Sequence, residues 1–570
     1  MKKNKNHYKL ILQILFFISI FNVIYAKNVD NYYKASSISN YFSGIVSLNN
    51  NEHANAYKYL KKVGGLEDKH LNYSKYYIYS LINLEKINEA YKYSKELEKK
   101  NLDSFESNLI IGIYNLKNKK YVESSQYFQK LKTQSMKGSL QFLISSSLYN
   151  WTTFREKNSI EALELISKMP DQFRDIQAVL THCFYDLNNT ESKFKTLLNN
   201  KNDFSRYSFF YANYLYKQKK TDQAINIIDS ALKKNPRNLL FKQMETDLTN
   251  QNTRHQSFKN IFDCQKISNN AAEILYIGSS LLSSQSIYSN ANFFLILAKY
   301  LNPDFISYDA LYAENLFKMK KYERAKNILK KISKKGRVYS WYASRQISQI
   351  LFKEEREKEG AKYITDKFYQ IEKPGIYEIY DFANFLKNNE RFEEAITNYS
   401  KLLEMINFEN DIYSSVSEGR GVAYERLGVW KKAEADLLNS LKKNPNQAYV
   451  INYLAYSWIE KGVNIEKSLK MLDKANKLKK NDGYITDSLG WALYKLKRYE
   501  DAKKYLQLAV TIMPADPIVN DHFADSLWMN NKFIQARYYW NYVLNLKKTD
   551  NKLKKIIKNK LIYGLNKKEV

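Results

Sequence analysis

A period of 34 residues in the C-terminal third of the chain constrains its fold more than any other feature. Equivalent segments begin with a small residue at steps of 34, 35 and 34 residues: Gly421, Ala455, Gly490 and Ala524. A segment of this length holds two helices and a corner, and such a hairpin cannot bury its apolar face alone. Neighbouring hairpins must therefore stack and share one continuous core.

The residue types inside one period indicate how its two helices pack. Gly490 and Ala502 are small where the two helix backbones cross, and Leu506 fills the space beside them. Ala509 lets the next hairpin dock, and Pro514 ends the second helix because proline has no N–H to donate. This order of positions resembles the tetratricopeptide repeat. The resemblance implies an all-α, right-handed superhelical solenoid with an inner and an outer wall.

The pattern continues toward the N-terminus, and no Pro-, Gly- or Ser-rich linker interrupts it. Weaker repeats must fill residues 138–200, 240–268 and 340–374. We expect about fifteen helix-turn-helix repeats, because one repeat takes about 34 residues. The predicted organisation is degenerate repeats over 27–410, well-matched repeats over 411–549 and a basic capping helix over 550–570. Pairs of small residues 12 positions apart carry the pattern in the earlier part: Gly44 and Ala56, Gly112 and Ser124, Ala212 and Ala224, Ala313 and Ala325, and Ala383 and Ala395.

The first 26 residues have the pattern of an export signal. Lysines precede an apolar stretch from Leu10 to Ile24, and Ala26 offers a small residue for cleavage. The stretch is short for a membrane span, which needs about 20 residues, so we favour cleavage over an uncleaved anchor. The C-terminal repeats also resemble tetratricopeptide proteins of Gram-negative envelopes. We therefore expect an exported, periplasmic protein.

The chain is strongly basic, with a formal net charge of +31. Such a charge can attract nucleic acid or an anionic lipid surface. Here the lysines are scattered among glutamates, whereas a nucleic-acid footprint is a clustered patch. We expect no nucleic-acid partner.

The sequence offers no constellation that could carry catalysis. Its six histidines are scattered, and the adjacent His182 and Cys183 would point in different directions from a helix. A Gly-rich phosphate loop and a paired-cysteine metal motif are both absent from the sequence. We therefore predict no enzymatic activity, no cofactor and no metal site.

The two cysteines, Cys183 and Cys264, lie 81 residues apart. An oxidising compartment would permit a disulfide between them. More than two repeats separate them, however, and elements that distant along a solenoid are not expected to touch. We expect two free, half-buried thiols.

The last segment of the chain has the pattern of an amphipathic helix. Leu553, Ile556, Ile557 and Leu561 recur at helical spacing, with lysines between them. A repeat array needs a polar cap at its end, and this helix is the candidate. The alternative is a basic helix that lies on an anionic membrane.

The resemblance implies that the first helix of each repeat lines the inner groove. On the last three repeats, this places aromatic and acidic residues together, a combination that suits extended peptides and sugar rings. The alternative is that Trp491 and Trp528 are packing residues, covered by the C-terminal helix or by coiling of the superhelix. The predicted groove residues are Asn452, Tyr456, Asp487, Trp491, Tyr494, Lys495, Asp521, Asp525 and Trp528.

These features together predict a non-catalytic exported scaffold. Its groove would bind another envelope protein, as an extended peptide or a protein surface, in envelope assembly or secretion. The alternative is a module that binds envelope polysaccharide through the tyrosines and tryptophans of the groove. Membrane contact is expected only through the basic C-terminal helix or an uncleaved N-terminal segment.

Overall fold

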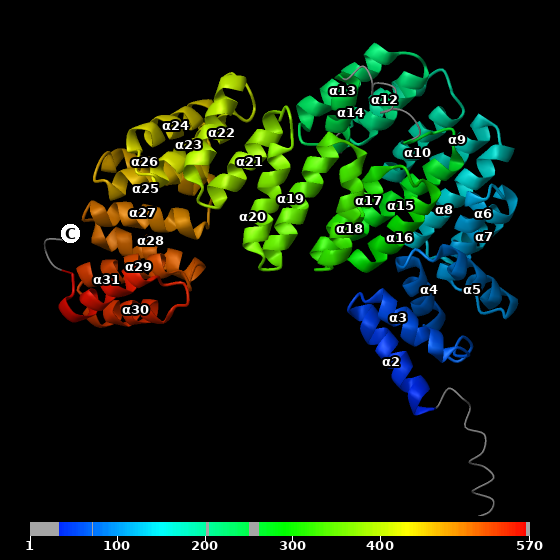
Figure 1. The fold of residues 1–570 in the computed structure, drawn as a ribbon, viewed down its shortest axis with the longest axis horizontal. Coiled ribbons are helices and arrows are strands. Elements are labelled where there is room, and N and C mark those ends of the chain that lie inside the picture. The colour runs from blue at the N-terminus through cyan, green and yellow to red at the C-terminus, as the bar shows by residue number, and fades with distance from the viewer. Residues whose placement is uncertain (1–33, 71, 201–203, 250–260, 566–570) are drawn as a thin grey trace, which may run out of the picture. The chain divides into compact units, whose positions relative to one another are not determined.

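The structure, a computed structural model, describes residues 34–70, 72–200, 204–249 and 261–565. The predicted export signal, residues 1–26, lies outside these ranges. Within them every regular element is a helix, which confirms the predicted all-α repeat fold (Figure 1). The same ranges contain no helix that is both long and apolar enough to cross a membrane.

The chain divides into two compact units, Met1–Lys367 and Phe368–Val570, and the division falls inside α20 (Glu357–Tyr369) rather than in a linker. The other helices of the first unit are α2 (Ala35–Asn49), α3 (His53–Leu60), α4 (Tyr73–Asn83), α5 (Ile87–Lys99), α6 (Phe105–Lys117), α7 (Tyr121–Gln134), α8 (Leu140–Thr153), α9 (Ser159–Ser167), α10 (Asp171–Phe184), α11 (Thr190–Leu198), α12 (Tyr207–Lys217), α13 (Thr221–Lys234), α14 (Leu239–Thr249), α15 (Ile267–Ser284), α16 (Tyr288–Leu301), α17 (Ile306–Lys318), α18 (Tyr322–Ile332) and α19 (Arg337–Lys353). The second unit contains α21 (Ile376–Asn388), α22 (Phe392–Met405), α23 (Tyr413–Arg426), α24 (Trp430–Lys443), α25 (Ala448–Glu460), α26 (Ile465–Leu478), α27 (Gly483–Lys495), α28 (Tyr499–Ile512), α29 (Pro517–Met529), α30 (Phe533–Asn545) and α31 (Asn551–Tyr563).

Successive helices pair into hairpins along both units. In the described ranges, α2 to α13 and α15 to α30 form consecutive pairs, whereas α14 and α31 stand outside this pairing. The residues after α14, 250–260, are not described. The predicted weak region 138–200 contains two hairpins, α8 to α11, and the region 340–374 is occupied by the hairpin of α19 and α20, which begins at Arg337.

A residue with left-handed backbone geometry marks most hairpin corners. In the last repeats this residue is Lys497 or Asn531, each with φ of 61° and 34 positions apart. Beside Lys497, the Arg498 N–H donates to the Leu493 carbonyl at 2.9 Å, which ends the first helix and reverses the chain. The same geometry, with φ between 49° and 63°, recurs at Asn51, Glu85, Lys119, Asp186, Lys219, Ser286, Lys320, Glu355 and Glu390. The turns between paired helices therefore recur along the chain as the small residues of the sequence do.

Small residues lie where the two helices of a hairpin cross, as predicted. A Cβ atom added to Gly490 would lie 2.6 Å from the Leu506 side chain and 3.1 Å from its backbone nitrogen, so α27 and α28 leave no room for one. At Ser124, where a serine takes one small position, the hydroxyl bonds to the facing backbone. Ser124 Oγ donates to the Gly112 carbonyl at 2.8 Å across α6 and α7.

The first unit departs from a simple linear stack, because distant helices contact one another within it. Helix α15 packs against α8, and α16 packs against both α4 and α6 (Figure 1). The Lys117 ammonium donates to the Leu301 carbonyl at 3.2 Å, and the Arg324 guanidinium donates to the Asn83 carbonyl at 2.9 Å. Helices α9 to α14 therefore lead the chain away from α8, and α15 brings it back to the same core.

This return corrects the prediction of two free thiols. Cys183 and Cys264 form a disulfide, with their Cα atoms 5.9 Å apart. Cys183 lies near the end of α10, and Cys264 lies just before α15, where the chain comes back. The prediction was wrong because it assumed that contacts run only between neighbouring repeats.

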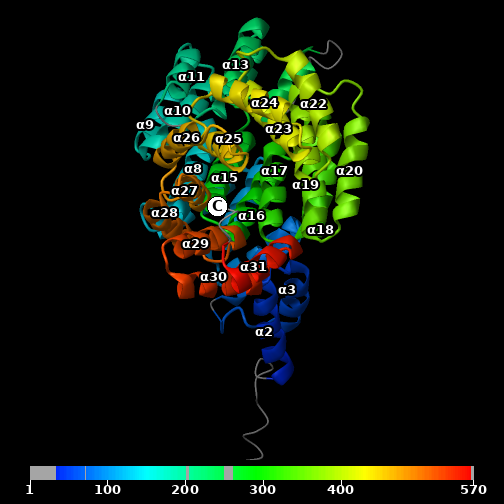
Figure 2. The same cartoon turned by 90° about the vertical axis from the view of Figure 1, so that its left-hand side faces the viewer.

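The predicted capping helix is α31, which lies beside α29 and α30 (Figures 1 and 2). Its N-terminus is capped by Asp550, whose carboxylate accepts from the Leu553 N–H at 2.8 Å. Leu553 and Ile557 are buried against the last repeat, whereas Ile556 is 42% exposed. Only part of the predicted apolar stripe is therefore used in packing.

Candidate functional site

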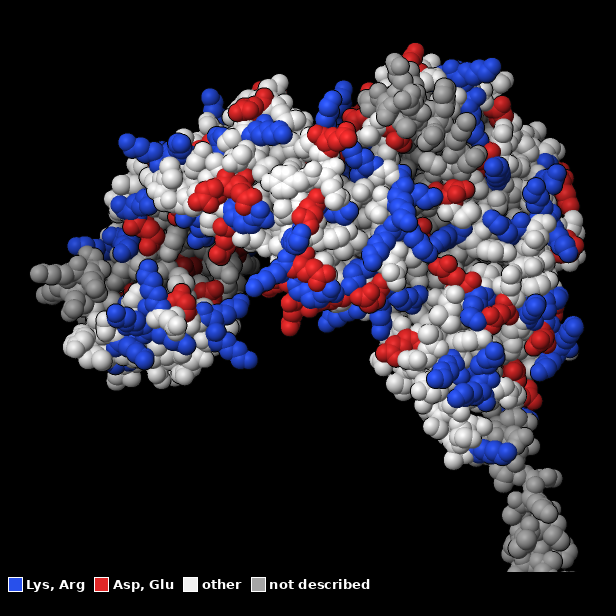
Figure 3. Space-filling model, in the orientation of Figure 1, with Lys and Arg blue, Asp and Glu red and all other residues white. Residues whose placement is uncertain are grey.

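The predicted site residues lie on three first helices of the second unit, α25, α27 and α29. These helices contact one another directly, α25 with α27 and α27 with α29. We call the set the A-helix strip: Asn452 and Tyr456 on α25, Asp487, Trp491, Tyr494 and Lys495 on α27, and Asp521, Asp525 and Trp528 on α29. Figure 3 shows that basic and acidic side chains are interspersed on the face it presents, without one continuous patch of either sign.

Acids on α23 and α25 each accept a hydrogen bond from the next first helix. Glu425 of α23 accepts from the Tyr453 hydroxyl of α25 at 2.8 Å. Glu460 at the end of α25 accepts from the Trp491 indole of α27 at 2.7 Å. We call these hydrogen bonds between first helices the acid ladder. Successive repeats are thus joined by polar contacts in addition to the apolar core.

The ladder continues to the C-terminal helix. Asp487 of α27 pairs with the His522 ring of α29 at 2.9 Å. The Lys560 ammonium of α31 then lies 2.7 Å from Asp521 and 2.8 Å from Asp525. Two carboxylates of the predicted site are therefore occupied by the protein's own capping helix.

Trp491 is a packing residue in this structure, with 7% of its surface exposed. Its ring stacks on Tyr494, with centroids 4.6 Å apart, and on His522, with centroids 3.9 Å apart. The Lys495 ammonium lies 4.9 Å from the Trp491 centroid. Tyr494, His522 and Lys495 thus surround the Trp491 ring, and little of the indole is left for a partner.

Burial and charge shift the pKa values of the groups at the α29–α31 contact. Burial and the nearby Asp521 charge raise the pKa of Asp525 to about 7, although Lys560 opposes the shift. Burial alone would lower the pKa of His522, but the Asp487 carboxylate raises it above its ordinary value. The end of the strip therefore contains a carboxyl group, Asp525, whose pKa lies near neutral pH.

Four members of the strip keep partly exposed side chains: Asn452, Tyr456, Lys495 and Trp528. The Tyr456 hydroxyl makes no hydrogen bond within the described residues. Burial and the charges of Glu460, Asp487 and Asp521 raise the pKa of that hydroxyl. The side-chain oxygen of Asn452, one turn away, also lacks a donor in the described part of the chain. The unbonded Tyr456 hydroxyl and the unsatisfied Asn452 oxygen thus lie together on α25.

Trp528 lies at the other end, beside the C-terminal helix. The Arg537 guanidinium lies 4.9 Å from the centroid of its ring. A Cβ atom on Gly564 would come within 2.1 Å of the indole, so the chain after α31 passes directly over this side chain. The C-terminal segment therefore covers part of the predicted site, as the packing alternative for Trp528 supposed.

The repeated corners and crossings match one known repeat, and a curated relative shares it. Over 132 residues the chain is 26% identical to TPR repeat-containing protein PA4667 of Pseudomonas aeruginosa, which covers 23% of this chain. The chain has tetratricopeptide-like repeats. The match spans only 22% of that relative's length. No family model matches the chain.

Solved structures with similar helical repeats include three bacterial proteins. A tetratricopeptide repeat protein from Parabacteroides merdae is 16% identical, covers 39% of this chain and 85% of its own, and has a TM-score of 0.33. MamA from Desulfovibrio magneticus is 15% identical over 31% of this chain and 97% of its own, with a TM-score of 0.28. A thermophilic TPR protein of Thermus thermophilus is 14% identical over 33% of this chain and its whole length, 100%, with a TM-score of 0.29.

The sequence prediction missed two residues that join the strip to its neighbours. His522 follows Asp487 by 35 positions, one repeat later, so alignment of the repeats by register could have paired them. Lys560 lies among several lysines of the capping helix, and no sequence signal separates it from the others. Within the described residues, no group of three or more His, Cys, Asp or Glu side chains could hold a metal ion.

Proposed function

We propose that this tetratricopeptide-repeat protein is an exported, non-catalytic scaffold that binds another envelope protein through its A-helix strip. A helical-repeat protein of this kind supports protein–protein interaction by presenting a long surface of small contacts. The partner would lie along α25 and α27 as an extended peptide or the edge of a folded surface. Envelope assembly or secretion is the setting that this proposal implies.

The unsatisfied acceptors around Tyr456 carry the proposal. The Asn452 oxygen lacks a hydrogen-bond donor in the described part of the chain, and the Tyr456 hydroxyl lies near three carboxylates without bonding to any of them. Buried or half-buried polar groups normally find a partner, and exceptions call for an explanation. A partner that presents lysine, arginine or backbone N–H donors would satisfy them.

Export is supported by two independent observations. The first 26 residues have the charge and apolar pattern of a signal segment. The Cys183–Cys264 disulfide is a bond that persists mainly in oxidising compartments such as the periplasm. Fractionation of cells that express the full chain, with a blot for size, tests both export and cleavage after Ala26.

Affinity capture with matched tyrosine variants tests the binding surface. Tyr456→Ala removes the central strip residue, whereas Tyr538→Ala removes a 69% exposed tyrosine of α30, a second helix outside the strip. We expect one or more proteins to be captured by the wild type and by Tyr538→Ala, and lost with Tyr456→Ala. Equal capture by all three proteins would place the binding surface elsewhere.

A further inference from the structure

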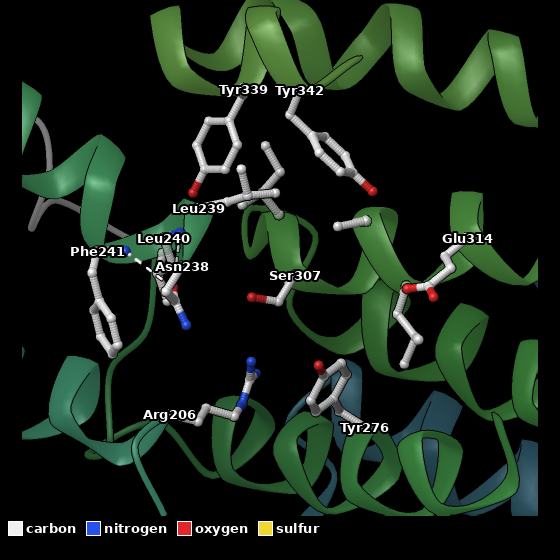
Figure 4. A pocket seen from close by; sticks show the side chains of 13 residues that line it. Arg206, Asn238, Leu239, Leu240, Phe241, Tyr276, Ser307, Glu314, Tyr339 and Tyr342 are labelled. Atoms are coloured by element: carbon white, nitrogen blue, oxygen red, sulfur yellow. Dashed lines mark hydrogen bonds between the residues drawn. The ribbon is translucent and has the colours of Figure 1, made fainter. Parts of the chain in front are cut away.

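A second candidate site lies in the first unit, apart from the A-helix strip. It is a cavity of about 400 Å³ between the start of α14, helices α15, α17 and α19, and the residue before α12 (Figure 4). Small-molecule sites in proteins have volumes of about 300–1,000 Å³, so the cavity is large enough for a compact ligand.

The floor of the cavity is a guanidinium whose charge is already balanced. Arg206 makes two parallel hydrogen bonds to Glu273, at 2.8 and 2.9 Å, and the Glu273 side chain is fully buried. The Arg206 side chain is 23% exposed and points into the cavity (Figure 4). Its centre also lies 4.0 Å from the ring centroid of Tyr276. Arg206 therefore offers its remaining N–H donors from a fixed position, without a net positive charge.

Hydroxyl and amide groups surround this floor with free hydrogen-bonding capacity. The hydroxyls of Ser307, Tyr276 and Tyr339 make no hydrogen bond within the described residues, although all three line the cavity. Asn238 uses its oxygen to cap α14, accepting from two backbone N–H groups at 3.1 and 3.3 Å, so its NH₂ group is left to donate. Each hydroxyl can both donate and accept.

The walls combine flat aromatic surfaces with one acceptor. Tyr339 and Tyr342 enter from α19, opposite Tyr276 of α15 (Figure 4). Glu314 of α17 places a carboxylate on the side of Tyr342, and burial together with that carboxylate raises the pKa of Tyr342 to about 12. The lining is thus apolar on its faces and polar at several edges.

We propose that this cavity binds a neutral saccharide. A sugar ring has flat C–H faces that pack on aromatic rings, and hydroxyls that donate and accept around its edge. That combination matches the tyrosine walls, the free hydroxyls, the Asn238 amide and the Glu314 carboxylate. A carboxylate or phosphate ligand fits less well, because Glu273 already neutralises Arg206 and Glu314 would repel an anion.

A glycan array probed with the full chain tests this proposal, followed by titration of the strongest neutral glycan. Tyr342→Ala removes a wall, and Ser307→Ala removes a hydroxyl without adding bulk. Tyr288→Ala, which removes a half-buried tyrosine of α16 outside the cavity, is the control. We expect each cavity variant to weaken binding about tenfold or more, as the loss of one wall or one polar contact implies, and the control to bind as the wild type does.

Three results would overturn the saccharide proposal: no neutral glycan bound on the array, binding only of charged glycans, or equal binding by all variants. Tyr456→Ala should leave glycan binding unchanged. The saccharide site and the protein-binding strip can therefore fail independently.

Discussion

The ammonium of Lys560 lies 2.8 Å from the carboxylate of Asp525, with 12% and 7% of the two side chains exposed. Lys560→Met would leave Asp521 and Asp525 buried without their cation. Loss of one partner from a buried pair costs about 3–5 kcal/mol, so α31 should detach from the last repeat far more often. Amide hydrogen exchange of α31 measures this directly. Lys558→Met, at an exposed position of the same helix, is the control, and equal exchange in both variants would mean that Lys560 does not hold the helix.

The same contact should respond to pH through Asp525. Its folded pKa of about 7 is above the unfolded value of about 3.9, so its contribution to stability is present at low pH and is lost as pH rises through 7. His522, whose pKa is also raised, changes stability in the same direction. We expect the protection factors of α31 to be higher at about pH 6 than at about pH 8.5. Asp525→Asn should reduce this difference, and an unchanged difference would assign it to another group.

The disulfide should be required for the return of the chain in the first unit. Removal of a native disulfide typically costs about 2–5 kcal/mol, and the segment closed here contains four helices, α11 to α14. Cys183→Ser should therefore lower the unfolding temperature of the first unit. Alkylation of the native chain should label no thiol before reduction and two thiols after it. Labelling of both cysteines without a reductant would contradict the pairing.

The crossing of α27 and α28 should not tolerate a methyl group. Gly490→Ala would place a carbon 2.6 Å from the Leu506 side chain and 3.1 Å from the Leu506 backbone nitrogen. Overpacking of this kind costs about 1–3 kcal/mol, seen as a lower urea midpoint for the second unit. Gly428→Ala is a useful contrast, because Gly428 has open space around it but a φ of 75°. It should be destabilising through its backbone conformation alone.

The repeats could be predicted from the sequence because their causes are local. The small residue at Gly490 and the proline at Pro514 each follow from packing or hydrogen bonding within one hairpin. The contact of α8 with α15 and the Cys183–Cys264 bond could not be predicted in this way. They depend on how several successive hairpins pack together. The spacing of small residues within a repeat does not determine that packing.

The candidate site was predictable in position but not in its contacts. The sequence placed Asp521, Asp525 and Trp528 on one first helix, where the structure has them. It could not show that Lys560 pairs with both carboxylates, because that lysine lies in a helix with many others. Arg206 and Glu273, 67 residues apart, are a similar case in the first unit. Ion pairs between repeats depend on register, and a single sequence leaves that register open.

Photocrosslinking in cells tests the central claim, that the A-helix strip binds a partner protein, most directly. A photoreactive phenylalanine analogue would replace Tyr456 in one full-length variant and Tyr538, an exposed tyrosine of α30 outside the strip, in a second. The account predicts one discrete crosslinked protein from position 456 and none from position 538. No crosslink at position 456, or the same crosslinks from both positions, would contradict it.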